Sequence, residues 1–134
     1  MPIESDVVYL DASALLKLVL EDDGSDELRT ALEGWPRRVS SKISLVEVLR
    51  TVRLKDPAAE PLARGVLART GLIAVGDRLL ATAVAVGPPL VRALDAIHLA
   101  TALRLDGRLA LFVSYDQRQL EAAAALGLPT ASPR

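Results

Sequence analysis

Residues 7–18 join two hydrophobic patterns at a single acid, and this junction constrains the fold more than any other stretch. The stretch begins with an uninterrupted apolar run that is rich in β-branched and aromatic residues. Such a run is typical of a strand buried on both faces, as in a parallel sheet. The pattern then becomes helical, with Leu15, Leu18 and Val19 able to share one face. Asp11 is the one charged residue at the changeover, so we expect it at the carboxyl end of a buried strand.

Strand and helix patterns alternate along the rest of the chain. Further strands are predicted at 38–41, 71–75 and 109–114, with space for a short one after residue 128. Helices are predicted to begin near Asp26, Ser41 or Ser44, Ala58, Gly76, Leu90 and Gln117. We expect Ser25 to cap the first of these helices and Pro36 to lie at its end. Because no repeat or linker interrupts the alternation, the sequence predicts a single domain over residues 1–134. Its expected architecture is a three-layer α/β/α fold with a central parallel sheet of about four or five strands.

Composition excludes several classes of protein. The 16 basic and 17 acidic residues nearly balance, which excludes a strongly basic nucleic-acid binder but leaves room for a local basic rim. The absence of cysteine excludes disulfides and zinc–thiolate sites, and the single histidine excludes a His-rich metal site. No apolar run approaches the roughly 18 residues that span a bilayer, and the first residues lack the pattern of a signal peptide. We therefore expect a cytoplasmic protein.

Four acids are singled out by their positions in the predicted elements. Asp11 and Asp116 each follow a predicted strand. The carboxyl ends of parallel strands meet at one edge of a sheet, where ligands bind in open α/β folds. Glu47 lies off the apolar stripe of its helix and Asp95 opens an alanine-rich helix, so both can approach the same edge.

Each acid also has a simpler explanation. Asp11 is a suitable N-cap, and Asp95 and Asp116 suit helix N-termini. Glu47 can pair with Arg50, three residues further on. If the four acids converge, however, their mutual repulsion requires a neutralising group, and carboxylate oxygens suit Mg²⁺ or Mn²⁺. One such ion, or two about 4 Å apart, can orient a water for in-line attack on a phosphodiester.

Four segments together resemble the PIN-domain proteins, most closely the VapC-type toxins of prokaryotic toxin–antitoxin pairs. The segments are YLDASALLK at 9–17, SLVEV at 44–48 with Arg50, LDAIHLATA at 94–102 and VSYDQRQL at 113–120. The likeness covers nearly the whole chain, with the segments in order and at separations like those of the family. No single segment is specific, but the four together are.

The resemblance implies a PIN-like fold and a Mg²⁺- or Mn²⁺-dependent endoribonuclease that hydrolyses RNA through a metal-activated water. In the family pattern the metal is surrounded by the positions of Asp11, Glu47, Asp95 and Asp116. The positions of Ser13 and Ser114 resemble secondary polar contacts of that site. The resemblance also implies a cognate antitoxin as partner, a homodimer or a toxin–antitoxin hetero-oligomer, and a location in the prokaryotic cytoplasm.

Several other residues have two interpretations each. His98 lies one helical turn after Asp95, where it can act as a general base or pack beside the site as a structural residue. Its position in the family resembles a structural one. Arg50, Arg53 and Arg118 can contact RNA phosphates, although scattered arginines are also commonly solvated.

The main alternative function is a binding module, in which the same fold holds RNA or a protein without chemistry. Four intact acids disfavour it, because an acidic pocket without a metal repels RNA. A third class uses an acceptor aspartate for phosphoryl transfer. That class requires a lysine after a late strand or a second aspartate two residues after Asp11, where this chain has Ser13.

Overall fold

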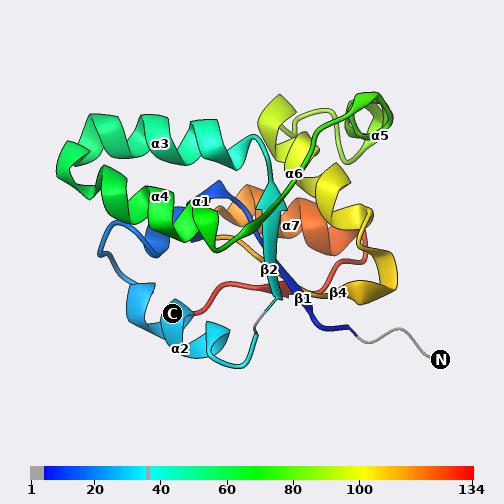
Figure 1. Ribbon diagram of the computed structural model, residues 1–134. Helices are drawn as coiled ribbons and strands as arrows, with labels where there is room; N and C mark the ends of the chain where they lie inside the picture. Colours follow the sequence, from blue (N-terminus) through cyan, green and yellow to red (C-terminus); the bar gives the residue numbers. More distant parts are fainter. Residues whose placement is uncertain (1–4, 36) are drawn as a thin grey trace.

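The computed structural model describes residues 5–35 and 37–134, so the first four residues of the predicted domain and the helix stop at Pro36 lie outside it. Within the described residues, five strands form one sheet in the order β3-β2-β1-β4-β5, with every pair parallel (Figure 1). The strands are β1 (Val7–Leu10), β2 (Arg37–Ser41), β3 (Gly71–Ile73), β4 (Leu109–Val113) and β5 (Thr130–Ala131). Helices cover both faces of this sheet, which confirms the predicted three-layer α/β/α fold.

The helices alternate with the strands as the patterns predict. They are α1 (Ala12–Lys17), α2 (Ser25–Leu32), α3 (Ser44–Lys55), α4 (Glu60–Ala68), α5 (Asp77–Ala85), α6 (Ala93–Leu103) and α7 (Gln117–Ala125). Short 3₁₀ turns, η1 (Pro57–Ala59) and η2 (Asp106–Arg108), precede α4 and β4. Across the described ranges, none of the helices combines the length and the apolar character needed to span a bilayer.

The central strand β1 contributes to the core on both sides of the sheet. Successive residues of a strand point to opposite faces. Val8 and Leu10 accordingly pack into the core that is shared with α1, α2, α3 and α4, whereas Tyr9 packs into the core that is shared with α6 and α7. All three side chains are fully buried. A strand with no solvent-facing position has to be apolar throughout, which is the pattern that the sequence displays.

The register of the sheet brings three strand ends together. Leu10 of β1 pairs with Val113 of β4, so Asp11 and Ser114 follow side by side. The Asp11 N–H extends the pairing by donating to the Val113 carbonyl at 3.2 Å. On the other side of β1, β2 ends at Ser41, and α3 begins shortly after it. Residues that follow these strands therefore share one edge of the sheet.

The prediction that Ser25 caps the second helix is wrong. The N-cap of α2 is Gly24, whose φ of 92° is in the left-handed region that glycine adopts without a steric penalty. Ser25 is the first residue of the helix, and its hydroxyl accepts a hydrogen bond from the Asp22 N–H at 3.1 Å. The hydroxyl is thus engaged by the preceding turn, so it makes no cap for α2.

Three other elements are shorter than predicted. α1 ends at Lys17, before the last two apolar positions of its predicted face, and β3 ends at Ile73. α6 begins at Ala93 instead of near Leu90. The segment before it contains two prolines, which lack an N–H, and the Val91 N–H bonds to the Pro88 carbonyl in a turn.

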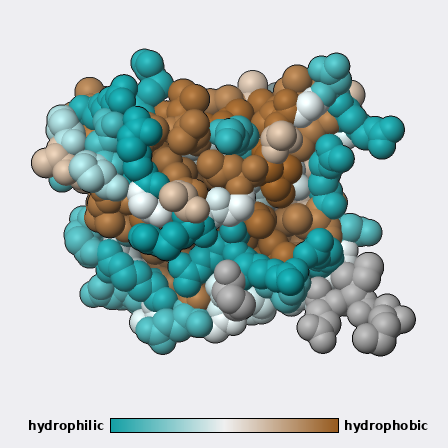
Figure 2. All heavy atoms as spheres, viewed as in Figure 1, coloured by the Kyte–Doolittle hydropathy of each residue, from teal (hydrophilic) through white to brown (hydrophobic). Residues whose placement is uncertain are grey.

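Large apolar side chains remain exposed on one part of the surface. Figure 2 shows hydrophobic side chains over a wide part of the viewed face, around the region where α3, α5 and α6 lie in Figure 1. The exposed residues of these helices include Val46, Val84 and Leu94, with 57%, 89% and 47% of their surfaces exposed. Contiguous exposed apolar surface of this kind commonly marks an interaction site.

Candidate active site

Asp11 lies at the end of β1 and is buried, with 4% of its surface exposed. Its Oδ1 accepts hydrogen bonds from the Ala14 N–H at 3.0 Å and the Ser13 hydroxyl at 2.6 Å. Its Oδ2 accepts one from the Ser114 hydroxyl at 2.5 Å. Burial raises the pKa of Asp11, while the charge of His98 and the two serine hydroxyls act in the opposite direction. Asp11 is therefore both the N-cap of α1 and the centre of a buried polar cluster.

Ser13 and Ser114 connect the start of α1 to the loop after β4. Their hydroxyl oxygens lie 3.3 Å apart. Ser13 Oγ accepts a hydrogen bond from the Tyr115 N–H at 2.9 Å, and Ser114 Oγ accepts one from the Asp116 N–H at 3.1 Å. Each serine thus joins one carboxylate oxygen of Asp11 to a backbone amide of that loop.

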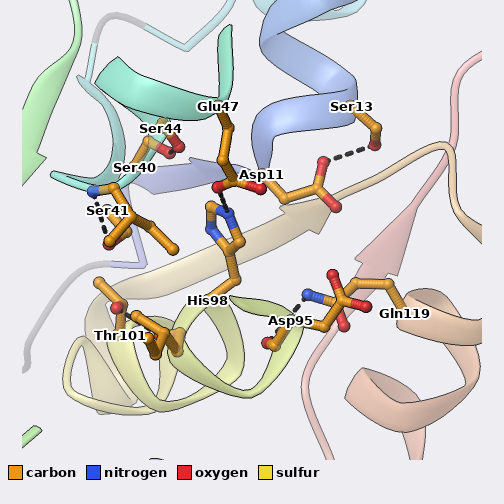
Figure 3. A network of polar contacts seen from close by, with 12 residues as sticks. Asp11, Ser13, Ser40, Ser41, Ser44, Glu47, Asp95, His98, Thr101 and Gln119 are labelled. Atoms are coloured by element: carbon orange, nitrogen blue, oxygen red, sulfur yellow. Dashed lines mark hydrogen bonds and ion pairs between the residues drawn. The ribbon is translucent and has the colours of Figure 1, made fainter. Parts of the chain in front are cut away.

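Glu47 reaches the same edge of the sheet from the first turn of α3. Its side chain is 23% exposed, and its Oε1 lies 2.7 Å from Nε2 of His98 on α6. Glu47 therefore pairs with His98 and not with Arg50, the partner that sequence spacing offered. Figure 3 shows Asp11, Glu47 and Asp95 on three different elements around His98.

Asp95 and Asp116 occupy the starts of α6 and α7. Asp95 lies in the first turn of α6 and is half-buried. Burial raises its pKa, and the negative charges of Asp116, Asp11 and Glu47 raise it further, against the lowering effect of His98. Asp116 is exposed and caps α7 by accepting two backbone N–H groups. The four predicted acids are thus close enough for the charges of the other three to act on Asp95.

The donor set has the chemistry of a Mg²⁺ or Mn²⁺ site. Carboxylate oxygens are the ligands that these hard cations prefer, and a divalent cation would relieve the repulsion that raises the pKa of Asp95. In residues 5–35 and 37–134, however, no three His, Asp or Glu side chains are grouped closely enough to hold a metal as they stand. One oxygen of Glu47 pairs with His98, and both oxygens of Asp11 accept hydrogen bonds from the serines. The residues fit the metal chemically but do not form a closed coordination shell.

An open groove of about 800 Å³ adjoins Asp95 and Asp116. Its lining includes Arg92, Arg118, Gln119, Val91 and Ala122. The groove therefore combines three acids, Asp95, Asp116 and Glu121, with two guanidinium groups and an apolar wall. Arginines beside carboxylates suit a polyanionic ligand whose phosphates need positive partners.

The three arginines singled out in the sequence lie in different places. Arg118 lines the groove. Arg53 instead forms an ion pair with Glu60 at 2.6 Å, which connects α3 to the start of α4. Arg50 is exposed on α3 and is not part of the groove lining. Arg92, which precedes α6, lines the groove and was missed because nothing in its local sequence distinguishes it.

Gln119 is a further residue that sequence reasoning missed. It is buried, with 1% of its surface exposed, and its Nε2 donates a hydrogen bond to the backbone carbonyl of Asp95 at 3.2 Å. This bond connects α7 to the first turn of α6. A signal was available, because Gln119 lies one turn after Asp116 and so shares its side of α7.

Comparisons with known proteins match this chain over most of its length. A family model described as PIN domain matches residues 8–125. Ribonuclease VapC46 of Mycobacterium tuberculosis (strain H37Rv) is 40% identical to this chain, over 94% of the chain and 97% of that protein. Ribonuclease VapC47 of Mycobacterium tuberculosis (strain CDC 1551) is 35% identical, over 95% and 97%.

Two solved structures share the fold. A Mycobacterium tuberculosis VapC20 structure, described as a sarcin-ricin loop cleaving toxin, superposes with a TM-score of 0.74 at 16% identity, covering 94% of this chain and 99% of that one. A chain of a toxin–antitoxin complex from Klebsiella pneumoniae superposes with a TM-score of 0.69 at 23% identity, covering 95% and 98%. At these identities the likeness concerns the fold alone.

Proposed function

The chain belongs to the PIN-domain family, and from this premise we propose that it is a Mg²⁺- or Mn²⁺-dependent endoribonuclease, the toxin of a toxin–antitoxin pair. The observation that carries the proposal is the approach of four acids from separate elements to one edge of the sheet, where burial and the charges of the other three raise the pKa of Asp95. The names of its relatives, which are ribonucleases, support the same activity. On this proposal residues 1–134 form one PIN-like domain.

The proposed division of roles follows the burial of each acid. Asp11 and Asp95 are the principal metal ligands, because they are the two whose burial makes a counter-charge most favourable. Glu47 and Asp116 complete the site. When bound, the ion supplies a Lewis acid and activates water for attack on a phosphodiester at neutral pH. Ser13 and Ser114 hold the Asp11 carboxylate in place.

Arg92 and Arg118 are proposed to bind the phosphates of the RNA. Both line the groove beside Asp95 and Asp116. Phosphate contacts position a nucleic acid without reading its sequence. Their part in the reaction is therefore to hold the strand so that one phosphodiester lies at the acids.

A cognate antitoxin is the proposed protein partner, within a homodimer or a toxin–antitoxin hetero-oligomer in the prokaryotic cytoplasm. One structure with the same fold comes from a toxin–antitoxin complex. This chain has an exposed apolar surface around α5 and α6 (Figure 2), where Val84 and Leu90 are 89% and 94% exposed. Surface of this kind would be covered in such an assembly.

The test is cleavage of RNA by the purified chain. We expect total RNA to be cut in the presence of Mn²⁺, with no cutting in EDTA and none by a folded Asp95→Asn variant. Glu33→Gln, which removes an exposed acid outside the groove, is the matched control and should cut normally. Cleavage by Asp95→Asn at the natural rate would overturn the proposal. RNA binding that is independent of divalent ions, without cleavage, would favour the binding module instead.

A further inference from the structure

Three side chains, Tyr9, His98 and Glu47, form a hydrogen-bonded relay from the centre of the sheet to the site, and the first two are buried. The Tyr9 hydroxyl lies 2.6 Å from His98 Nδ1, and His98 Nε2 lies 2.7 Å from Glu47 Oε1. Tyr9 and His98 are 0% and 1% exposed, whereas Glu47 is partly open to the site. Figure 3 shows the His98 ring directed at the Glu47 carboxylate. The three residues come from β1, α6 and α3, so these contacts join both helices to the sheet.

The direction of the hydrogen bond to Glu47 follows from the carboxylate, and the direction of the bond to Tyr9 follows when the His98 ring is neutral. An ionised carboxylate only accepts hydrogen bonds, so His98 Nε2 must carry the proton that is donated to Glu47. In the neutral ring, Nδ1 is then an acceptor, and the Tyr9 hydroxyl donates to it. Tyr9 thereby selects the His98 tautomer that can hold Glu47.

The Tyr9 side chain, at the buried end of the relay, is held rigidly. The Tyr9 ring stacks on Phe112 of β4 with ring centres 5.2 Å apart and planes 6° apart. It meets the His98 ring edge to face, with ring centres 5.8 Å apart and planes 76° apart. Packing on both sides holds the ring so that its hydroxyl lies beside His98 Nδ1. Such support is what a ligand side chain needs in order to keep its orientation.

This geometry also decides between the two interpretations of His98. Both ring nitrogens are engaged, and the side chain is 2% exposed. A general base needs a free nitrogen within reach of the substrate. His98 has none, so it acts through Glu47 and does not touch RNA.

We propose that Tyr9 and His98 are positioning residues that hold the Glu47 carboxylate ready to complete the metal site, an inference that rests on the proposed function. Glu47 would otherwise be free to rotate into solvent, because its remaining surroundings give it no other charged partner among the described contacts. Loss of groups that orient a metal ligand typically lowers metal affinity by about 10- to 100-fold. The proposal therefore predicts an effect on Mn²⁺ binding that can be measured without RNA.

A matched pair of variants tests the role of His98. In His98→Gln, the amide nitrogen takes approximately the place of Nε2 and can still donate to Glu47. In His98→Asn, the amide nitrogen takes approximately the place of Nδ1 and cannot reach the Glu47 carboxylate. Both variants lose the ring, so packing damage is similar and is monitored by thermal melting without metal. By calorimetry with MnCl₂ alone, we expect near-natural affinity for the Gln variant and at least about tenfold weaker binding for the Asn variant. Equal affinities would overturn the relay.

Tyr9→Phe tests the far end of the relay and remains informative if the His98 variants fail to fold. It keeps the ring that stacks on Phe112 and removes only the hydroxyl. We expect weaker Mn²⁺ binding than in the natural chain, by severalfold, because the His98 tautomer is no longer selected. Unchanged affinity would remove Tyr9 from the proposal.

The proton positions can be checked in the natural chain without metal or RNA. His98 is the only histidine in the sequence, so ¹⁵N spectra of the untagged protein contain one imidazole to assign. We expect a proton on Nε2, and an unprotonated Nε2 would overturn the relay whatever the metal data. A natural chain that binds no Mn²⁺ would instead overturn the proposed function, so the two failures are distinguishable.

Discussion

The Ser114 hydroxyl donates a hydrogen bond of 2.5 Å to Asp11 Oδ2, although 103 residues separate the two in the chain. Ser114 is 0% exposed and Asp11 is 4% exposed, so no water replaces this donor if it is lost. The bond connects the ends of β1 and β4 and holds one of the two buried acids of the proposed site.

The first prediction concerns Ser114→Ala. The change leaves a buried carboxylate oxygen without its donor, so we expect the free energy of unfolding to fall by about 1–3 kcal/mol. Urea denaturation at neutral pH measures it. Ser5→Ala is the control, because it removes an exposed hydroxyl that also bonds across the chain, to the Gly107 carbonyl. The control should change stability by no more than about 0.5 kcal/mol. Equal losses in the two variants would contradict the role of Ser114.

The second prediction concerns metal and thermal stability. A ligand that binds only the folded state stabilises it by about 2.7 kcal/mol at a concentration 100 times its Kd. We expect Tm of the natural chain to rise with MnCl₂ and to fall back when EDTA is added. In Asp95→Asn the rise should be largely absent, and Tm without metal should be higher than in the natural chain, because the repulsion that raises the pKa of Asp95 is removed. A full Mn²⁺ response in that variant would argue against Asp95 as a ligand.

The third prediction concerns acid stability at the junction of α3 and α4. Arg53 and Arg64 donate to Glu60 and lower its pKa from 4.5 to about 2. Between these pH values the unfolded chain binds the proton and the folded chain does not, so stability increases with pH. This contribution is complete above about pH 4.5 and is lost as the pH falls toward 2. Glu60→Gln should therefore flatten the dependence of Tm on pH in that window.

The cause of that effect can be separated from a general effect of charge. Arg53→Gln removes the arginine that lowers the pKa of Glu60 more than Arg64 does. It should flatten the dependence of Tm on pH in the same window in part. Arg104→Gln removes an exposed arginine from the end of α6 and should leave the window unchanged. The pairs are exposed, so added salt should weaken the effect. An identical response from both arginine variants would show that net charge, not the pairing, is responsible.

The fourth prediction compares two arginines. Arg118 lines the groove, whereas Arg53 is paired with Glu60 on the α3–α4 side. We expect Arg118→Ala to weaken RNA binding equally for different sequences and to reduce the slope of log Kd against log salt by about 1. Arg53→Ala should leave the RNA affinity and the salt slope unchanged. Fluorescence anisotropy with labelled RNA, in the non-cleaving Asp95→Asn background, measures them, and equal effects would place the RNA outside the groove.

Much of the fold was predictable because the signals are local. The apolar run at 7–10 is rich in β-branched and aromatic residues, which is typical of a strand buried on both faces, and its switch to a helical period at Asp11 marks a strand end. The alternation of strands and helices then requires a parallel sheet. Residue type was a weaker guide to the helix starts. Ser25 is a favoured cap but is engaged by the preceding turn, and Gly24 takes the cap position.

The candidate site was predictable only as a set of acids near one edge. By itself the sequence determined which elements form and which acids follow or begin them, since hydrophobic period and capping preference depend on neighbouring residues. Only the tertiary structure decided that Glu47 turns to His98, 51 residues away, and that Gln119 bonds to the Asp95 carbonyl. Such pairs depend on how far each helix is shifted and rotated against the sheet. Packing across the core sets those shifts, and no local pattern contains them.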